Sequence, residues 1–221
     1  YLNYNKNFGL DHHLDAMLGM AYEAEEVRMF MARRDNFITD ELWELNLGGT
    51  GNMKNDAKAE HWATSSAFAR IGYSFKNKYI LETNFRYDGS SRFPSDERWA
   101  FFPSASVGWR ISQEPWWNVK SEHISNAKVR FSWGSLGNAA GLSNYQYIQT
   151  LGISKSDYIL DGLRQNYMSS PAALPGNLTW ETATTYDIGA DLGFFDNRLT
   201  VSGDYYIRKT TDMIVNGPTV P

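Results

Sequence analysis

The feature that most constrains this chain is a strict alternation of apolar and polar side chains, clearest in residues 77–93. The odd-numbered positions (the apolar parity) carry Tyr79, Leu81, Thr83, Phe85 and Tyr87. The even-numbered positions (the polar parity) carry Lys78, Glu82, Asn84, Arg86 and Asp88. Successive side chains of a strand point to opposite faces, so this stretch predicts a strand with one apolar and one charged face. The residues that follow, Asp88-Gly89-Ser90-Ser91, predict a turn.

The same alternation recurs along the chain and predicts an all-β, antiparallel protein. We expect about eight strands, at roughly 1–8, 12–23, 63–75, 79–88, 98–112, 126–135, 180–194 and 198–211. The short connections are 9–11, 76–78, 113–125 and 195–197. The long connections are at about 24–62, 89–97 and 136–179, and the first could begin with a short helix between Ala24 and Leu45.

Composition argues against several classes of protein. The chain carries 25 acidic and 21 basic residues, a net charge of −4, and nucleic acid as a partner would require a basic surface. It contains no cysteine, so no disulfide holds it together. The chain contains no run of roughly 18 apolar residues, so the sequence predicts no transmembrane helix. Residues 1–8 lack the basic and apolar regions of a signal peptide, so we expect the chain to begin inside a domain.

Apart from Lys6 in the first strand, charge is confined to one face of the predicted strands. From the second strand onward, the mid-strand Asp, Glu, Lys and Arg residues all fall on the polar parity. The apolar face could pack on a second sheet, as in a soluble sandwich, or it could meet lipid.

Three features favour lipid. The segments are about ten residues or longer, which is long for the strands of a sandwich. The alternation of short and long connections is typical of outer-membrane barrels. Trp99 and Trp109 lie roughly 23 Å apart along the membrane normal at a ~45° tilt, close to the apolar band of such a barrel. Aromatic residues mark both strand ends on the apolar face: Phe75, Tyr79, Trp109 and Phe194 at one, and Tyr22, Tyr87, Trp99, Trp133, Tyr186 and Tyr205 at the other.

Several stretches of the chain resemble one family in content and in order. They are 68–79 (FARIGYSFKNKY), 86–93 (RYDGSSRF), 102–109 (FPSASVGW), 128–138 (KVRFSWGSLGN), 178–182 (LTWET) and 187–199 (DIGADLGFFDNRL). No single stretch is a catalytic signature, but their ordered occurrence over almost the whole chain is specific. By these residues the sequence is similar to the TonB-dependent outer-membrane transporters, specifically the SusC/RagA-like branch of Bacteroidetes.

The resemblance implies a fold, a function and a set of partners. The implied fold is a transmembrane barrel of about 22 strands, of which residues 1–221 would supply about eight. The implied function is nutrient uptake, the import of oligosaccharides or peptides across the outer membrane of a Gram-negative cell, with no enzyme activity and no cofactor. The implied partners are a SusD-like surface lipoprotein acting as a lid, TonB, outer-membrane lipid, and the glycan or peptide substrate. TonB would be reached through a region not in this chain.

The matching stretches all correspond to the barrel of that family and to no other part of its members. We find no stretch that resembles its plug domain, its TonB box or its signal peptide. About eight strands cannot close a barrel of about 22, and an open sheet edge is not viable in lipid. We therefore expect residues 1–221 to be part of a larger chain.

Residue types that often carry catalysis or bind metals are scattered here. Two acidic pairs, Glu25-Glu26 and Asp96-Glu97, read as solvated surface carboxylates. The glycine-rich loop 48–52 lacks the Lys and Ser/Thr of a phosphate loop. The four histidines have no second ligand at metal-binding spacing. They are His12, His13, His61 and His123. We therefore predict no catalytic residue and no metal site.

Two groups of residues are candidates for contact with partners or substrate. Charged side chains expected to face the lumen would form ion-pair networks in the wall, or else contact the plug or the substrate. They are Arg70, Glu82, Arg86, Arg110, Lys128, Arg130 and Asp191. Aromatic residues of the outer loops would stack on sugar rings, contact a lid protein, or pack within the loops. They are Trp43, Tyr145, Tyr147, Tyr158 and Tyr167.

Two alternatives stay open at this point. The chain could be a self-contained eight-stranded outer-membrane barrel with a structural or adhesive role, which would require its first and last strands to pair. It could also be a soluble β-sandwich that binds carbohydrate, with the apolar face packed on a second sheet.

Overall fold

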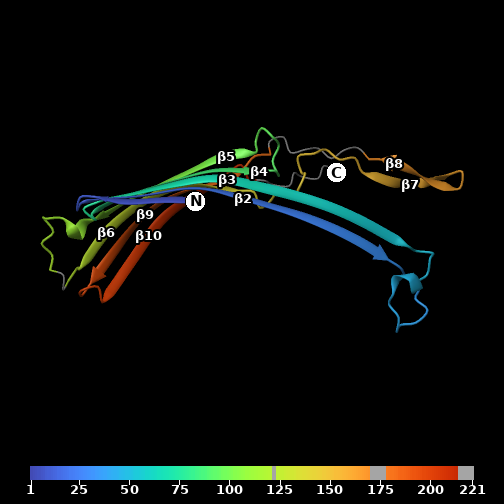
Figure 1. The fold of residues 1–221 in the computed structure, drawn as a ribbon, viewed down its shortest axis with the longest axis horizontal. Helices are drawn as coiled ribbons and strands as arrows, with labels where there is room; N and C mark the ends of the chain where they lie inside the picture. Colours follow the sequence, from blue (N-terminus) through green and yellow to red (C-terminus); the bar gives the residue numbers. More distant parts are fainter. Residues whose placement is uncertain (121–122, 170–177, 214–221) are drawn as a thin grey trace.

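The computed structural model describes residues 1–120, 123–169 and 178–213, which form one eight-stranded antiparallel sheet and a separate hairpin. The sheet contains β1 (Leu2–Phe8), β2 (His12–Arg33), β3 (Lys54–Phe75), β4 (Tyr79–Ser90), β5 (Trp99–Arg110), β6 (Asn126–Asn138), β9 (Glu181–Phe194) and β10 (Leu199–Thr211). The hairpin contains β7 (Ile153–Leu160) and β8 (Leu163–Met168). Strands adjacent in the chain are neighbours in the sheet, except that the hairpin intervenes between β6 and β9 (Figure 1). The predicted all-β, antiparallel fold class is confirmed.

The register keeps the polar side chains of neighbouring strands on one face. Arg70 of β3 lies opposite Asn84 of β4, which in turn lies opposite Ser104 of β5. On the other parity, Leu81 of β4 lies opposite Val107 of β5. Residues directly opposite each other share a face of the sheet. The sheet therefore has a polar face and an apolar face.

Aromatic side chains on the apolar face follow lines that run obliquely across the strands. At the long-loop end, the aromatic residue of β5 is Phe101 and that of β9 is Tyr186. In the register Tyr186 lies at the level of Ala105, which is four residues (101 to 105) along β5 from Phe101. At the short-turn end, Trp109 of β5 lies at the level of Ala190 of β9. The aromatic residue of β9, Phe194, lies four residues (190 to 194) farther along that strand. The two lines are displaced equally and stay parallel, as expected for strands tilted within a barrel.

Strands β2 and β3 are each 22 residues long and project beyond the rest of the sheet (Figure 1). They stay paired as far as Arg33 opposite Lys54, whereas β4 pairs with β3 only as far as Thr64. The segment 24–62, predicted as a long loop, is therefore mostly a paired hairpin with its turn at 34–53. We call residues 24–62 the β2–β3 arm.

The prediction of a short helix at the start of this segment is wrong. Residues 24–33 are strand, and a 3-10 turn lies farther along, at Leu45–Leu47. Glu25, Glu26 and Arg28 place charge on both faces of β2, so the alternation ends although the strand pairing continues. A hairpin with water on both sides needs no apolar face, and periodicity therefore does not detect it.

The connection between β6 and β9 also contains structure that was not predicted. The strand β6 continues to Asn138, and the β7–β8 hairpin lies within the expected loop 136–179. The apolar side chains of the β7–β8 hairpin are largely exposed, with Tyr158 at 81% and Ile153 at 71%. Residues 170–177 of this predicted loop lie outside the described residues, as do 121 and 122 of the predicted connection 113–125.

The eight-stranded sheet is open. Strands β1 and β10 are its two edges and do not pair with each other in the described chain, so these residues do not form a closed eight-stranded barrel. Within the same ranges no second sheet packs on the apolar face, and Met20 and Tyr22 stay 81% and 73% exposed. The sandwich arrangement is therefore not observed. No helix in the described parts of the chain is long and apolar enough to cross a membrane.

Candidate functional site

Ion pairs between neighbouring strands organise the polar face of the sheet. Arg130 of β6 donates from Nε to Asp191 Oδ2 at 3.0 Å and pairs through Nη2 with Asp204 Oδ1 at 2.8 Å. These carboxylates come from β9 and β10, so one guanidinium joins three strands. Gly189 lies opposite both Arg130 and Asp204 in the register, and a Cβ there would meet both side chains. The absence of a side chain at Gly189 leaves the space in which the three charges meet.

A second ion pair joins β3 to β2. Arg70 donates from Nη2 to Asp15 Oδ2 at 3.1 Å, beside Gly72. The Nε of Arg70 is buried and has no hydrogen-bond partner among the described residues. The predicted residue Arg70 is therefore held on the polar face by a carboxylate of the adjacent strand.

Two more of the predicted residues have partners on their own strand, β4. Glu82 accepts a hydrogen bond from Asn84 Nδ2 at 3.1 Å. Arg86 pairs with Asp88 Oδ2 at 3.1 Å. These contacts orient the side chains along the strand and do not tie β4 to a neighbour.

The last three predicted residues lie in one row near the short turns. Arg110 of β5 is directly opposite Lys128 of β6, which is directly opposite Asp191 of β9. Two cations beside one carboxylate leave this part of the polar face positively charged, next to Arg130. All seven predicted charged residues thus share the polar face.

Between these charges the polar face forms a groove of about 380 Å³ lined by polar side chains together with Phe102, Ala105, Trp133 and Leu136. Its lining includes Glu82, Asn84, Arg86, Phe102, Ser104, Ser106, Ser132, Gly134, Ser135 and Thr185. Hydroxyl and carboxamide groups offer hydrogen bonds to any neutral polar molecule. The arrangement is suited to contact with a passing or docked molecule.

The long loops are anchored by a small buried core at the end of the sheet opposite the short turns. The fully buried ring of Phe93 lies 4.7 Å from the ring of Trp180, centre to centre. Phe102, Leu142 and Leu178 complete this apolar cluster. It joins the loop after β4, the loop after β6 and the segment before β9.

Arg92 connects this core to the β2–β3 arm. Its guanidinium lies 4.7 Å from the ring centre of Trp62, and its Nε donates to Asn144 Oδ1 at 3.0 Å. Asn144 donates in turn from Nδ2 to Glu60 Oε2 at 3.1 Å. We call Arg92, Trp62, Asn144 and Glu60 the arm clamp. It fixes the base of the arm to two other loops.

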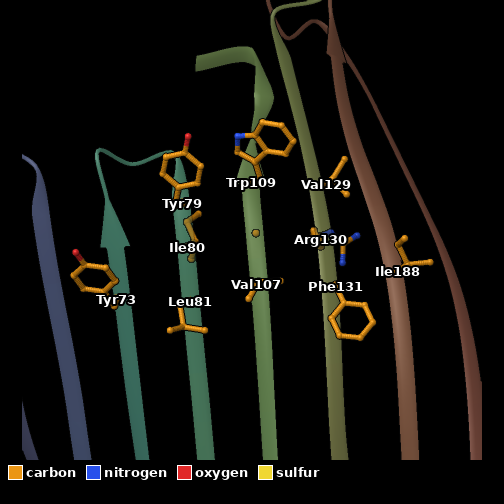
Figure 2. Close-up of a pocket in the computed structure, with 11 residues that line it drawn as sticks. Tyr73, Tyr79, Ile80, Leu81, Val107, Trp109, Val129, Arg130, Phe131 and Ile188 are labelled. Carbon is orange, nitrogen blue, oxygen red and sulfur yellow. The ribbon is translucent and has the colours of Figure 1, made fainter. Parts of the chain in front are cut away.

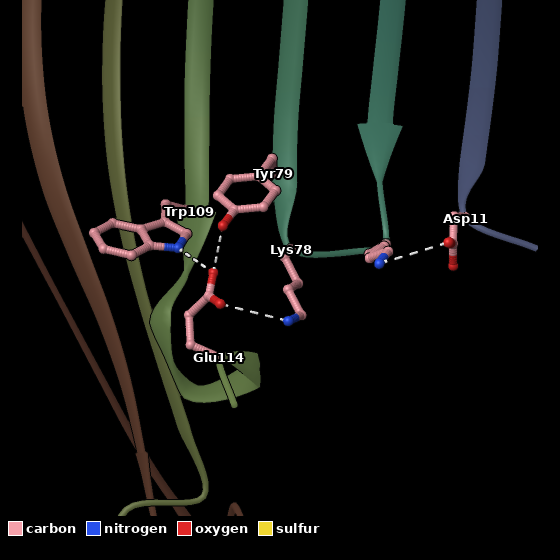
Figure 3. Close-up of polar contacts among 6 residues, drawn as sticks. Asp11, Lys78, Tyr79, Trp109 and Glu114 are labelled. Carbon is pink, nitrogen blue, oxygen red and sulfur yellow. Dashed lines mark hydrogen bonds and ion pairs between the residues drawn. The ribbon is translucent and has the colours of Figure 1, made fainter. Parts of the chain in front are cut away.

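At the short-turn end, one carboxylate holds three side chains (Figure 3). Glu114 follows the 3-10 turn Ile111–Gln113 and accepts hydrogen bonds from Tyr79 Oη at 2.6 Å and Trp109 Nε1 at 3.0 Å. Its other oxygen lies 3.5 Å from Lys78 Nζ, and its side chain is only 8% exposed. The hydrogen bonds from Tyr79 and Trp109, helped by the charge of Lys78, outweigh burial and lower the pKa of Glu114 from its ordinary 4.5.

Comparison with known proteins assigns the chain to one family. Residues 1–221 match the family described as TonB dependent receptor-like, beta-barrel. This chain belongs to that family. The resemblance identified in the sequence is confirmed.

Relatives of this receptor barrel cover nearly all of the chain. TonB-dependent receptor P3 of Formosa agariphila is 36% identical over 220 residues, which are 99% of this chain and 21% of the relative. TonB-dependent receptor SusC of Bacteroides thetaiotaomicron is 32% identical over 227 residues, covering 100% of this chain and 21% of the relative. The structure of the RagAB peptide transporter matches with a TM-score of 0.85 and 28% identity, over 99% of this chain and 24% of that one. The chain spans about a fifth of the length of these curated relatives.

In this receptor barrel, two of the predicted loop aromatics pack within the protein. The hydroxyl of Tyr145 lies 2.5 Å from Nδ1 of His61 and accepts a hydrogen bond from the His61 amide. Tyr147 packs against the apolar cluster around Phe93. Both residues have their contacts within the loop end of the protein.

The other three predicted aromatics are exposed, and they lie on two different elements, the turn of the arm and the β7–β8 hairpin. Trp43 lies in the turn of the arm, is 72% exposed and has Phe37 as a neighbour at 6.2 Å between ring centres. Tyr158 and Tyr167 lie on the β7–β8 hairpin and are 81% and 51% exposed. The structure therefore does not gather the five aromatics into one site.

Sequence reasoning missed the residues that join the ends of the receptor barrel. Arg92 lies in the stretch 86–93 that carries the family resemblance, but its partner Asn144 is 52 residues away. Glu114 lies 35 residues from Tyr79. Strand periodicity carries no information on such contacts between loops. Among the residues described, no group of three or more His, Cys, Asp or Glu is placed to hold a metal ion.

Proposed function

We propose that this chain forms part of the wall of a TonB-dependent outer-membrane transporter that imports oligosaccharides or peptides. The observation that carries the proposal is the two-faced sheet, whose register keeps charged and hydroxyl groups on one face across its strands. In a membrane barrel the polar face lines the lumen and the apolar face meets lipid. Membership of the receptor family supports import as the activity.

In this proposal the seven charged residues predicted from the sequence line the lumen, together with their carboxylate partners on the polar face. Those held in ion pairs between strands, such as Arg130 and Arg70, keep the wall rigid while facing water. The groove beside Ser104 and Ser132 offers hydrogen bonds to the plug or to substrate. Substrate passes along this wall and is not chemically changed by it.

The transporter would act with partners outside this chain. A SusD-like lipoprotein would cover the long-loop end, and TonB would act through a region of the protein not in residues 1–221. The exposed aromatics Trp43, Tyr158 and Tyr167 are the candidates for contact with the lipoprotein or with sugar rings. The RagAB relative is a peptide transporter, which supports a peptide substrate, and the family resemblance of the sequence also allows an oligosaccharide.

Cysteine labelling of the full-length protein in intact outer membranes tests which face meets water. Residues 1–221 contain no cysteine, so a cysteine introduced at Ser132 on the polar face or at Ile188 on the apolar face is the only one in this segment, and the unsubstituted full-length protein gives the labelling background. A membrane-impermeant maleimide should label the Ser132→Cys variant and leave Ile188→Cys unlabelled. The reverse result would refute the proposed facing.

Uptake by cells tests the activity itself. Cells that make the full-length protein should accumulate a fluorescent oligosaccharide or a fluorescent peptide, and a protonophore should abolish that accumulation. Uptake that continues without a proton gradient would contradict a TonB-dependent transporter. Accumulation of one substrate and not the other would identify the substrate class.

A further inference from the structure

The turn at the end of the β2–β3 arm contains a pocket that differs from the cavities of the sheet. A cavity over the apolar face, such as the one beside Val107, belongs to the surface that meets lipid in the proposed function (Figure 2). The pocket of the turn has a volume of about 450 Å³. Its lining comes from the two strand ends, at 32–34 and 53–55, and from residues 45–46 of the 3-10 turn. We call it the arm pocket.

Hydrogen bonds hold the two walls of the arm pocket together. The amide of Gly49 donates to Asp35 O at 2.9 Å, and Arg34 donates from Nη1 to Gly48 O at 3.2 Å. Gly48 is buried, and a Cβ at this position would lie 2.6 Å from Cβ of Arg34. Glycine therefore lets the 3-10 turn pack directly against the end of β2. The pocket between them is a fixed feature of the turn.

Positively charged residues are prominent in the lining of the arm pocket. The lining includes Arg33, Arg34 and Lys54 and no acidic residue of the described chain. Arg33 and Lys54 are directly opposite each other, and they are the one pair of like charges along the register of β2 and β3. Like charges placed in this way destabilise a strand pair. Asp35 accepts a hydrogen bond from Nε of Arg33 at 2.8 Å, which offsets one of the three charges.

The two arginines keep donors for a ligand beyond the contacts described. Arg34 uses Nη1 on Gly48 O, and Arg33 uses Nε on Asp35. A guanidinium carries several N–H donors in a planar fork that matches the two oxygens of a carboxylate. Together with the ammonium of Lys54, these groups make the arm pocket suited to an anion.

The rest of the lining is apolar or carries carboxamides. Leu45 and Met53 are 47% and 57% exposed, so they present apolar surface beside the cations. Asn46 and Asn55 each offer a donor and an acceptor to an amide group. Within the described chain no aromatic side chain lines the pocket, so it offers no ring on which a sugar could stack.

We propose that the arm pocket binds the C-terminal end of a peptide. The peptide carboxylate lies at the cations, its last side chain is apolar and lies against Leu45 and Met53, and its amide groups meet Asn46 and Asn55. A volume of about 450 Å³ is within the range of small-molecule sites. The role of the pocket rests on the proposed function, because in that orientation the turn holds a bound peptide outside the channel before import.

Photo-crosslinking of the purified full-length protein tests this site. The probe is the tripeptide Gly-Gly-Leu with a diazirine in its leucine side chain, used once with a free carboxylate and once as the C-terminal amide. Mass spectrometry of proteolytic fragments then gives the labelled positions. Arg34→Gln and Lys54→Gln each remove one cation of the pocket. Arg28→Gln is the matched control, since Arg28 lies on the same arm, contacts Glu26 and does not line the pocket.

We expect the carboxylate probe to label residues 45–55 of wild type and of Arg28→Gln, and to label Arg34→Gln and Lys54→Gln at least fivefold less. Hydrogen exchange at the Gly49 amide checks that the turn of each variant stays folded. The amide probe should label wild type at least fivefold less than the carboxylate probe, and this comparison needs no variant. Equal labelling by the two probes would overturn the carboxylate site.

Competition identifies the ligand class. Inorganic phosphate or an acidic oligosaccharide, each at the concentration of the probe, should not displace it. Displacement by phosphate would mean a simple anion site, and displacement by the oligosaccharide would mean a glycan site, and either result overturns the proposal for a peptide.

Uptake by cells separates the arm pocket from the proposed function. Uptake that depends on the proton gradient, in a protein that the probe does not label at 45–55, refutes the arm pocket alone. Labelling at 45–55 without such uptake refutes the proposed function and leaves peptide binding in place.

Discussion

Glu114 joins three side chains at the short-turn end of the sheet. Its carboxylate is the common acceptor for Tyr79 and Trp109 and the partner of Lys78, although all three come from other segments of the chain. A carboxylate with several donors is favoured in its charged form. The charge of Glu114 therefore contributes to the stability of this end of the sheet.

The lowered pKa of Glu114 predicts a pH dependence. Because its pKa in the folded state lies below the ordinary 4.5, the stabilisation is complete above about pH 4.5 and is lost as the pH falls through the folded value. We expect Glu114→Gln to lower the Tm of the full-length protein at pH 7, and the difference from wild type to disappear in more acidic solution. Thermal unfolding at a series of pH values measures this.

The exposed residue Glu97 provides the control for that series. Glu97→Gln should leave the Tm close to wild type at every pH. A Tm difference for Glu114→Gln that persists at acidic pH would mean that its charge is not the cause.

In each strand, the alternate positions that carry apolar residues determine which side of the strand belongs to the apolar face of the sheet. Ile188 lies on the apolar face of β9, between Tyr186 and Phe194. A lysine in the apolar band of a membrane barrel costs about 2–4 kcal/mol near the midplane. We expect Ile188→Lys to lower the free energy of unfolding in bilayers by roughly that amount, as measured by urea titration.

Ser132→Lys is the matched control for that substitution, because Ser132 lies on the polar face of β6 and lines the polar groove. Its lysine would face water and should change the unfolding free energy by much less. Similar losses for both variants would contradict the assigned faces.

The arm clamp predicts how firmly one loop is held. Arg92 stacks on Trp62 and donates to Asn144, and two such contacts together contribute about 1.5 kcal/mol. Arg92→Ala should therefore speed hydrogen exchange at the Leu142 and Ile148 amides, which donate within that loop, by about tenfold. Exchange measured by mass spectrometry on the full-length protein checks the rate.

Arg164, on the separate β7–β8 hairpin, provides the control substitution for the arm clamp. Arg164 contacts Asp157 within β7–β8. Arg164→Ala should leave the Leu142 and Ile148 amides unchanged. If Arg92→Ala has no larger effect than Arg164→Ala, the clamp does not stabilise the loop.

The elements that the sequence predicted are those whose two faces meet different surroundings. The stretches 79–88 and 180–194 were predicted close to their observed bounds because apolar and charged residues alternate along them. The arm and the β7–β8 hairpin were missed because water reaches both of their faces, which removes the alternation. Contacts such as Arg92 with Asn144 depend on how loops meet in space, and no local pattern encodes them.

For the whole molecule, the two free edges of the sheet are the decisive feature. The backbone groups along β1 and β10 that point away from the sheet have no strand to pair with in the described chain. Unpaired backbone groups are strongly unfavourable in lipid. Stable insertion therefore requires further strands on both sides.

Electrophoresis tests this requirement. Closed barrels stay folded in cold SDS and migrate differently after heating, so the full-length protein should show this shift. Residues 1–221 expressed alone should not show it, because their edges stay unpaired. A heat-dependent shift by the isolated segment would mean that β1 and β10 can close, and would favour the self-contained barrel.

The length of the β2–β3 arm determines what an approaching particle meets first. Beyond the clamp at Trp62, β3 extends to Lys54, eight residues (54 to 62) or about 26 Å. In the proposed orientation, an antibody or a bacteriophage tail fibre coming from outside reaches the turn 34–53 before it reaches the channel. We therefore expect a short peptide tag inserted at 49–51 to bind antibody on intact cells when the lipoprotein partner is absent.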